Sequence, residues 1–454
     1  MNPELLRNIW VELTERRLTL MIVIVACVLL VAISPGQWSS ASFTAELLFY
    51  AVVVVWGTRC AAQSVVEEIS TKTWDSQRLS AIRPWTMVWG KLLGSTMLAW
   101  IGGIMCLAVI MISAFRAGGT ESLVNQTIYF LTIGLLSQAV ALLASIVAVR
   151  RRMSHSRFDV FLYQLAGLIA ALLVWRVWQT ADPTSLFRSW TGGIDPFAVR
   201  EVWWWGGSFD PGTFYVASLV AFVFWTLLGN YRVMRRELQV QNGPVVWLCF
   251  IVFLAGYAGG FDFWRDYVRE SSFMIGMRAV QAGMTIAVVT YGMALVEPKE
   301  VVAYRWLIER FKRRQFISLL GRFPAWGYAY LTVVILGVIA ILMLPWTIAE
   351  KANVYGGPMI VLAALGFVLR DCAVFMAMGL GQVGKRSDIA ALAILALLYV
   401  FLPGMFAQVP GATVAFYPSE HDPSWLNPLI AWTQALLGWF LILRRPDLRL
   451  RPQT

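Results

Sequence analysis

The chain has 454 residues, of which 59% are hydrophobic and only 14% are charged. A soluble protein carries about 25% charged residues, so this composition excludes a soluble globular fold and indicates an integral membrane protein. The net charge of +11 does not indicate a nucleic-acid partner, because the basic residues lie mainly in connectors on one side of the apolar segments.

The chain begins with a predicted surface helix and continues with membrane spans. In residues 2–17 apolar side chains recur at helical spacing, which predicts an amphipathic helix in the membrane interface. Longer apolar runs predict helical spans, because lipid admits only helices or closed barrels and these runs are too long for barrel strands. We therefore predict an all-α polytopic membrane helical bundle. About twelve runs have the required length: residues 18–34, 45–66, 92–114, 127–149, 160–178, 214–230, 245–260, 272–294, 326–348, 357–380, 389–407 and 427–443.

Orientation follows from the lysines and arginines. They are concentrated in alternate connectors, on the side that also holds both chain ends. Cytoplasmic loops carry the excess of basic residues, so we expect both the N-terminus and the C-terminus in the cytoplasm.

An internal repeat is suggested by similar segments in the two halves of the chain. The segment "SVVEEISTKTWDSQRLSAIRPW" resembles "ALVEPKEVVAYRWLIERFKRRQFISLLGRFPAW", which contains an insertion, and similarity between the two halves of a chain indicates duplication. We expect two halves of about six spans each, residues 1–240 and 241–454; the alternative is two unrelated bundles that share only membrane composition. The matched pairs are Glu67 with Glu297, Trp74 with Trp306, Arg78 with Arg310, and Pro84 with Pro324.

Residues 67–94, here called the first connector, are longer and more charged than a turn between two spans requires. Trp74, Arg78 and Ile82 recur every four residues, which predicts one face of a short helix, and Pro84 ends the pattern. This predicts a rigid cytoplasmic projection that a soluble partner could bind. The residues after it are typical interfacial anchors of the next span: Trp85, Trp89 and Lys91.

The first connector carries a more specific resemblance. Its pattern E-x-x-x-x-T-W-D-x-x-R-L-S-x-I-x-P-W-x-M-V-W-G-K-L-L is similar to the segment between spans 2 and 3 of ABC transporter permeases of the type-2 exporter family. The N-terminal "NPELLRNIWVELTERRLTLM" is also similar, and the resemblance covers residues 1–240. It implies a coupling helix that docks on a separate ATPase subunit. The implied coupling residues are Trp74, Asp75, Arg78, Leu79, Pro84 and Trp85, with a second contact at Arg151, Arg152 and Arg157.

The resemblance also implies a location and partners. We expect a bacterial plasma (inner) membrane protein, in contact with membrane lipids and with ABC ATPase subunits. ATP and magnesium would bind in the partner subunit, so this chain is expected to hold no cofactor and to be no enzyme. The second half departs from the family, because typical members have six spans and dimerise. Either a homodimer or a pseudo-dimer within one chain would then form the path.

The second connector, residues 294–326, is longer and more basic than the first and lacks its Trp-Asp pair. It would engage the ATPase differently or not at all. Its coupling candidates are Trp306, Arg310 and Pro324.

Charged residues within or at the ends of the predicted spans need a partner or a route to water. We expect each to be either a bundle-stabilising ion pair or a contact with the substrate path: Arg59, Arg278, Arg370 and Asp371. Before the sixth predicted span, the outer segment "REVWWWGG" is rich in interfacial tryptophan and predicts a surface-lying or re-entrant segment.

Two other functions have different sequence requirements. A proton- or ion-coupled secondary transporter would need intramembrane acids, of which Asp371 is the clear candidate. A membrane-embedded lipid or glycan transferase would need clustered acidic or histidine residues, and none is found in the sequence.

Metal and nucleotide sites are not indicated. No metal site is predicted, since the five cysteines form no CxxC pair and only two histidines exist. The segment "GLGQVGKRS" departs from the phosphate-binding pattern at Arg386 and follows a predicted membrane helix rather than a strand.

Overall fold

The computed structural model describes most of the chain as helix. The described residues are 2–33, 38–79, 82–150, 157–181, 201–240, 242–263, 271–344, 357–380, 385–406, 408–409, 411–418, 425–445 and 448. In this part of the chain eleven helices are long and apolar enough to cross a membrane, and the one sheet is a two-stranded hairpin. The predicted all-α helical bundle is confirmed, and the protein is a multi-pass integral membrane protein.

One predicted span is corrected. The apolar run at residues 245–260 forms the helix α10, Val245–Gly259, which has only 15 residues. At 1.5 Å per residue this helix is about 22 Å long, whereas the hydrocarbon core is about 30 Å thick. The run is apolar over its full length, but the helix ends at Gly260, against which the indole of Trp204 packs. A Cβ at Gly260 would lie 2.2 Å from Nε1 of Trp204.

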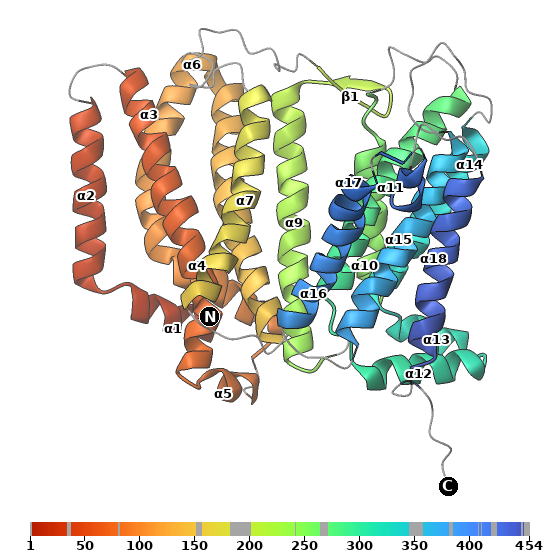
Figure 1. Cartoon of the computed structure of the whole chain (residues 1–454). Helices are drawn as coiled ribbons and strands as arrows, with labels where there is room; N and C mark the ends of the chain where they lie inside the picture. Colours follow the sequence, from red (N-terminus) through yellow and green to blue (C-terminus); the bar gives the residue numbers. More distant parts are fainter. Residues whose placement is uncertain are drawn as a thin grey trace. The chain divides into compact units, whose positions relative to one another are not determined.

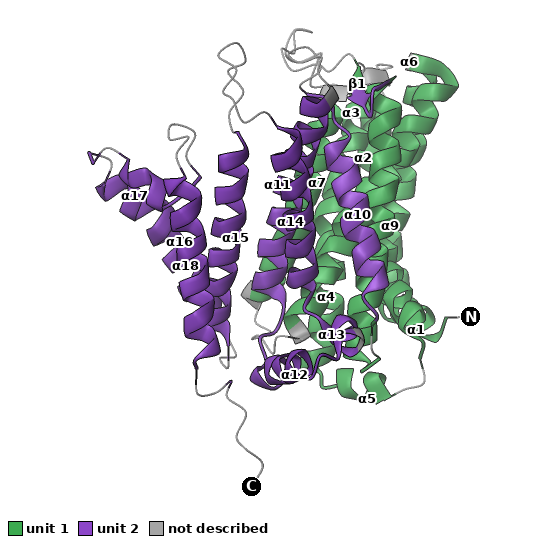
Figure 2. Ribbon diagram, turned by 90° about the vertical axis from the view of Figure 1, so that its right-hand side faces the viewer, with its two compact units in different colours: residues 1–202, 208–242 green, residues 203–207, 243–454 purple. Residues whose placement is uncertain are grey.

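The helices pack into two compact units (Figure 2). Unit 1 comprises residues 1–202 and 208–242, and unit 2 comprises residues 203–207 and 243–454.

Unit 1 is built around α6, a helix of 67 residues that is interrupted at two glycines. Gly119 has φ of 68°, a conformation that glycine adopts without strain, so α6 is in effect two successive spans, Pro84–Arg116 and Gly118–Ala148. The α6 helix packs on its neighbours along both spans (Figure 1). The elements of unit 1 are α1 (Pro3–Glu12), α2 (Glu15–Ile33), α3 (Trp38–Phe49), the π-helix η1 (Tyr50–Trp56), α4 (Gly57–Ser70), α5 (Trp74–Leu79), α6 (Pro84–Arg150), α7 (Arg157–Ala181) and α9 (Pro211–Glu237).

Unit 2 contains two strongly packed helix pairs, α11 with α14 and α15 with α18. Two short helices, α12 and α13, lie at one end of the unit (Figure 1). The helices of unit 2 are α10 (Val245–Gly259), α11 (Ser271–Val296), α12 (Val301–Lys312), α13 (Phe316–Arg322), α14 (Ala325–Met343), α15 (Pro358–Gly379), α16 (Lys385–Ala396), η2 (Leu397–Phe401), α17 (Leu402–Met405), η3 (Ala412–Ala415) and α18 (Leu426–Leu443).

The tryptophan-rich segment forms a β-hairpin of β1 (Val202–Trp204) and β2 (Gly207–Phe209). Its tip belongs to unit 2, where the indole Nε1 of Trp204 donates to the carbonyl of Tyr257 at 3.1 Å. The backbone N–H of Trp205 donates to the carbonyl of Gly260 at 2.7 Å. The predicted surface-lying or re-entrant segment is therefore, in its described part, a hairpin held to α10 by hydrogen bonds.

Candidate functional site

The first connector contains a short helix held close to the end of α4. The chain turns at Lys72, which has φ of 60°, and α5 follows with six residues, Trp74–Leu79. The turn is closed by the backbone N–H of Thr73, which donates to the carbonyl of Glu68 at 2.9 Å. As Figure 1 shows, α5 and α1 lie at the same end of unit 1.

Next to α5 lies a group of four charged side chains from three other helices, here called the ion cluster: Glu4, Arg7, Glu68 and Lys91. Glu4, Glu68 and Lys91 are buried, whereas 42% of the Arg7 side chain is exposed. Lys91 is fully buried, and its Nζ donates to Oε1 of Glu4 at 3.3 Å and to Glu68. Arg7 donates to Oε1 of Glu4 at 2.8 Å and also to Glu68. Two cations thus meet two carboxylates, so the cluster carries no formal net charge.

The ion cluster also binds α5 itself. Nζ of Lys91 donates to Oε1 of Gln77 at 3.1 Å and lies 5.2 Å from the ring centroid of Trp74. Trp74 is only 4% exposed, so its indole covers the buried ammonium group. Because a buried charge is costly unless it is paired and hydrogen-bonded, these contacts favour one position of α5 above the cluster.

The helix α1 is held next to the ion cluster by contacts with the start of α6. Nδ2 of Asn2 donates to the carbonyl of Thr86 at 2.8 Å, and Nδ2 of Asn8 donates to the carbonyl of Gly90 at 3.1 Å. A Cβ at Gly90 would lie 2.6 Å from the side chain of Glu4, so glycine permits this close approach.

Two apolar side chains near the end of α1 are uncovered. Trp10 is 82% exposed and Val11 is 63% exposed. An interfacial helix presents apolar side chains of this kind to lipid. The helix predicted over residues 2–17 is shorter in the structure, where α1 ends at Glu12 and α2 begins at Glu15.

The predicted coupling residues of α5 divide between its two faces. Asp75 and Leu79 point outward, with 86% of the Asp75 side chain and 89% of Leu79 exposed. Arg78 is partly buried, and its Nε donates to the carbonyl of Glu237 at the end of α9 at 3.1 Å. Together with the buried Trp74, Arg78 anchors the helix, whereas Asp75 and Leu79 are available to a partner.

The next predicted residues lie at the start of α6. Pro84 is the first residue of that helix, where its missing N–H and fixed φ are tolerated. Trp85 is 41% exposed and packs edge-on against Trp89 and Tyr231, with ring centroids 5.7 and 5.2 Å away. This packing fixes the Trp85 ring at the start of α6.

The predicted second contact is largely outside the described residues. Arg151 and Arg152 lie there, and Arg157 is described only as the first residue of α7.

The second connector has a different construction. It forms α12 and α13, and Trp306 in α12 lies beneath the guanidinium groups of Arg310 and Arg322, whose Cζ atoms are 5.2 and 5.0 Å from its ring. Pro324 directly precedes α14, whose first backbone N–H, from Ala325, donates to Oε2 of Glu297 at 2.9 Å. Carboxylates near a helix N-terminus are stabilising, so Glu297 holds the end of the connector against α14.

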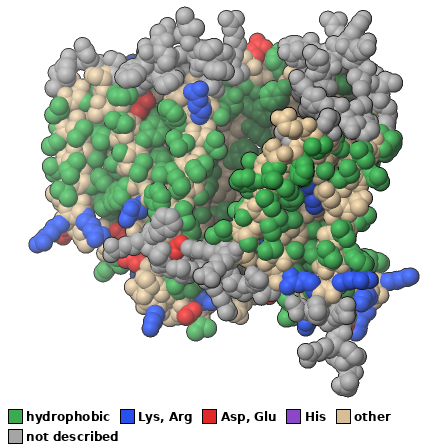
Figure 3. Space-filling model, viewed as in Figure 1, with side chains coloured by type: hydrophobic (Ala, Val, Ile, Leu, Met, Phe, Trp, Pro, Cys, Tyr) green, Lys and Arg blue, Asp and Glu red, His purple; other side chains and the backbone are tan. Residues whose placement is uncertain are grey.

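The exposed surface of α12 and α13 carries both basic and apolar side chains. No residue of α12 is buried, and Lys and Arg side chains gather at this end of unit 2 in Figure 3. Tyr304 on α12 is partly buried, and the loss of hydration raises the pKa of its hydroxyl above its usual value. The hydroxyl therefore stays protonated and accepts from Nε1 of Trp326 at 3.3 Å. The exposed apolar residues are Val302, Phe311, Phe316 and Leu320.

Arg370 and Asp371 form a buried ion pair within α15. Oδ1 of Asp371 accepts from Nε of Arg370 at 2.9 Å, and its Oδ2 accepts from the hydroxyls of Tyr291 at 2.9 Å and Tyr399 at 2.5 Å. Arg370 also donates to Oε1 of Gln434 at 3.0 Å. These residues come from α11, α15, η2 and α18, so the pair links the helices of unit 2.

The other two predicted intramembrane cations have different surroundings. Arg278 pairs with Asp262 through two nitrogens and stacks over Trp205 with its Cζ 5.0 Å from the ring. The backbone N–H of Gly206 donates to the second oxygen of Asp262 at 2.7 Å, so this pair fastens the hairpin tip to α11. Arg59, on α4, is exposed.

The ion cluster was not predicted as a site. The sequence pattern predicts only an interfacial anchor at Lys91 and indicates no role for Glu4 and Glu68. The available signal was the position of Glu68 and Lys91 beside apolar residues at the two ends of the first connector, where each charge needs a partner.

Comparisons of the chain with family models, with curated proteins and with solved structures found no match.

Proposed function

We propose that the chain is the transmembrane permease subunit of an ATP-binding cassette exporter. The supporting observation is the construction of the first connector, in which α5 exposes Asp75 and Leu79 while buried charges and Trp74 hold its other face. A helix that transmits movement between a soluble subunit and membrane helices needs both features, an exposed contact surface and a firm attachment to several spans.

In this proposal an ATPase subunit binds the exposed face of α5, and it alone binds ATP and magnesium. The end of unit 1 that carries α5 faces the cytoplasm of a bacterium, in line with the basic residues of that side. Binding and hydrolysis of ATP in the partner would change the position of α5, and the ion cluster would pass the change to α1, α4 and α6. The membrane chain itself would catalyse no reaction.

The secondary-transporter alternative depends on Asp371, and the geometry does not favour it. An ion-coupling carboxylate has to exchange its partner with water or a cation. Asp371 is 1% exposed and already accepts from Arg370 and from two tyrosine hydroxyls. This arrangement is that of a structural ion pair.

The transferase alternative also lacks a supporting arrangement. Among the described residues no group of three or more histidine, cysteine, aspartate or glutamate side chains could hold a metal ion. We therefore retain a single proposal.

Co-purification tests the proposal. The full-length tagged chain would be purified in mild detergent from its native host, and the proteins bound to it identified. We expect a nucleotide-binding ATPase subunit with the parent chain and about tenfold less of it with the double variant Asp75→Lys, Leu79→Ser. Both substitutions are on the exposed face of α5, so the fold is expected to be unchanged.

A matched control is Glu121→Lys, which changes a charge at an exposed position on the opposite side of the α6 span from Pro84. It should retain the ATPase. Absence of any ATPase from the parent preparation would rule out the proposed subunit role.

A further inference from the structure

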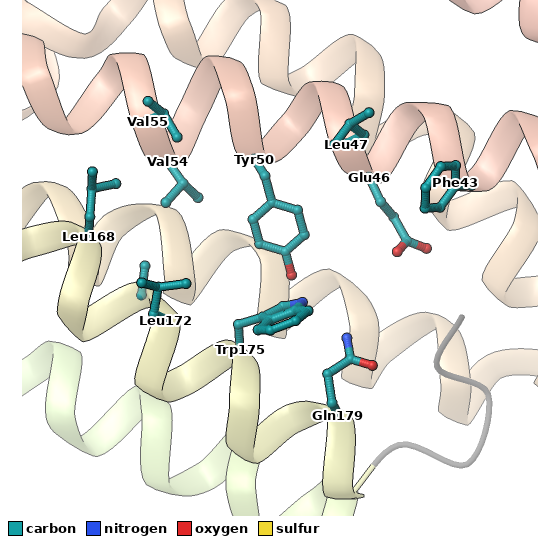
Figure 4. Close-up of a pocket in the computed structure, with 11 residues that line it drawn as sticks. Phe43, Glu46, Leu47, Tyr50, Val54, Val55, Leu168, Leu172, Trp175 and Gln179 are labelled. Carbon is teal, nitrogen blue, oxygen red and sulfur yellow. The ribbon is translucent and has the colours of Figure 1, made fainter. Parts of the chain in front are cut away.

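Unit 1 contains a cavity of about 600 Å³ between the α3–η1 segment and α7. Figure 4 shows its lining, with Glu46 and Tyr50 on one wall and Trp175 and Gln179 on the other. Neither the coupling proposal nor the buried charges described above involve this cavity.

The cavity lies beside a stretch of π-helix. The seven residues Tyr50–Trp56 form η1, between α3 and α4, and π-helical turns within α-helices occur frequently at functional sites. Behind η1 the packing is tight, because a Cβ at Gly103 would lie 2.3 Å from the side chain of Val53. The free volume is therefore on the side of η1 that faces α7.

The cavity opens between two membrane-spanning helices. Leu47 and Leu172 both line it and are 59% and 60% exposed. A hydrocarbon chain in the bilayer could thus enter sideways. The lining from Glu46 to Val55 extends over ten helical residues, whose nine steps span roughly 13 Å, which suits an elongated ligand.

The two ends of the cavity differ in polarity. Val54, Val55 and Leu168 line one end and are apolar. Toward the other end Glu46 and Gln179 point toward one another across the cavity, with the apolar Phe43 beside Glu46 (Figure 4). The cavity therefore has the polarity of an amphiphile, with one polar end and a long apolar end.

The polar end offers hydrogen-bond acceptors. Oε1 of Gln179 is buried and has no hydrogen-bond partner among the described residues. The carboxylate of Glu46 accepts from Oγ of Ser42 at 3.3 Å and brings a negative charge. The nearby Tyr50 hydroxyl already shares a hydrogen bond with Tyr129 at 2.7 Å.

We propose that this cavity binds a single-chain amphiphile whose head group is a protonated amine. An ammonium group supplies three hydrogen-bond donors and no acceptor, so it can bind the side-chain oxygen Oε1 of Gln179 and the carboxylate of Glu46 together. The indole face of Trp175 beside them provides a further favourable surface for a cation. The carboxylate repels fatty acids, and it repels the phosphate of phospholipids in the same way. The binding site does not depend on the ATPase partner.

Direct binding tests this inference. The full-length chain would be placed in phosphatidylcholine nanodiscs, with empty nanodiscs measuring partition into lipid. Radiolabelled dodecylamine, which is protonated at pH 7, would be titrated and then competed with dodecanol and with dodecanoate. We expect dodecylamine to bind at least about tenfold more tightly than either competitor, because it alone pairs with Glu46.

Variants locate the site. Glu46→Gln should weaken dodecylamine binding about tenfold and leave dodecanol unchanged, and Gln179→Leu should weaken it about fivefold. Leu172→Trp should abolish the binding of dodecylamine and of dodecanol, because the larger side chain fills the cavity. Glu121→Gln removes an exposed carboxylate outside the cavity and should change nothing. If the Glu46→Gln protein is not monodisperse, the binding measurements on Gln179→Leu and Leu172→Trp still test whether the amine binds in this cavity.

Three results would overturn the inference. The first is no saturable dodecylamine binding above empty nanodiscs. The second is dodecanoate binding as tight as that of the amine. The third is dodecylamine affinity that none of the cavity variants changes.

Discussion

Lys91 at the start of α6 is fully buried, and its ammonium nitrogen lies 3.1 Å from the side-chain oxygen of Gln77 in α5. The same nitrogen binds Glu68 at the end of α4 and Glu4 in α1. One side chain thus links four helices that are adjacent at this end of unit 1. The position of α5 is set by these contacts, since the helix has only six residues and would be marginal without them.

Removal of the central cation should destabilise unit 1 strongly. Lys91→Met keeps most of the side-chain volume but leaves Glu4 and Glu68 with Arg7 alone, so we expect the free energy of unfolding to fall by about 3–5 kcal/mol. Thermal unfolding of the purified chain in detergent measures this. The exposed Lys72→Met is the control and should change the free energy of unfolding by no more than about 0.5 kcal/mol. Equal stability of both variants would contradict a structural role for the cluster.

Docking of α1 should depend on the absence of a side chain at Gly90. In Gly90→Val the new Cβ would lie 2.6 Å from the Glu4 side chain, so we expect α1 to detach from α6. Limited proteolysis should then cleave the variant near Thr14, a position that we expect to be resistant in the parent. Gly292→Val, at a helical position with no atom within 4 Å of its Cβ, should leave the N-terminal cleavage pattern as in the parent.

The Arg370–Asp371 pair should behave as a structural pair rather than as a transport site. Asp371→Asn leaves a buried guanidinium without its carboxylate and should destabilise the chain by about 3–5 kcal/mol. The double variant Arg370→Met, Asp371→Asn should recover part of this loss. Glu309→Gln breaks the exposed pair of Glu309 with Arg313 and should cost at most about 1 kcal/mol. A double variant less stable than Asp371→Asn would argue against a mutually compensating pair.

The two ends of unit 1 should be accessible from opposite sides of the membrane. In a cysteine-free background, Leu79→Cys reports on α5 and Glu121→Cys on the turn within α6, one span away. With α5 cytoplasmic, a membrane-impermeant maleimide should label Glu121→Cys in intact cells and Leu79→Cys only after the membrane is opened. The reverse pattern would invert the proposed orientation and remove the basis for an ATPase contact at α5.

The helical character of the protein could be predicted with little more than hydropathy. Backbone polar groups in lipid must be hydrogen-bonded within their own segment, so an apolar run of about 20 residues has almost no alternative to a helix. The prediction of a membrane span at residues 245–260 was wrong for a specific reason. Apolar composition does not reveal where a helix ends, and α10 ends where Gly260 meets Trp204, from a distant part of the chain.

In the first connector, too, the sequence predicted a helix but not the contacts that the helix makes. Helical spacing predicted that Trp74 and Arg78 lie on one face of a short helix. They do lie on one face of α5, and this face packs against the rest of unit 1. Spacing alone does not state which face of a six-residue helix is covered. The covering groups are Lys91 and the carbonyl of Glu237, 17 and 163 residues away from Trp74, and only the folded chain brings them together.

The sequence by itself determined that this protein is a multi-pass helical membrane protein, because the cost of unpaired backbone groups in lipid depends only on local composition and length. The tertiary structure decided which charges meet in the ion cluster, which residues of α5 remain exposed, and where a cavity remains between α3 and α7. These features depend on contacts between helices far apart in the chain, whose pairing is selected by packing and by compensation of buried charge rather than by any local pattern.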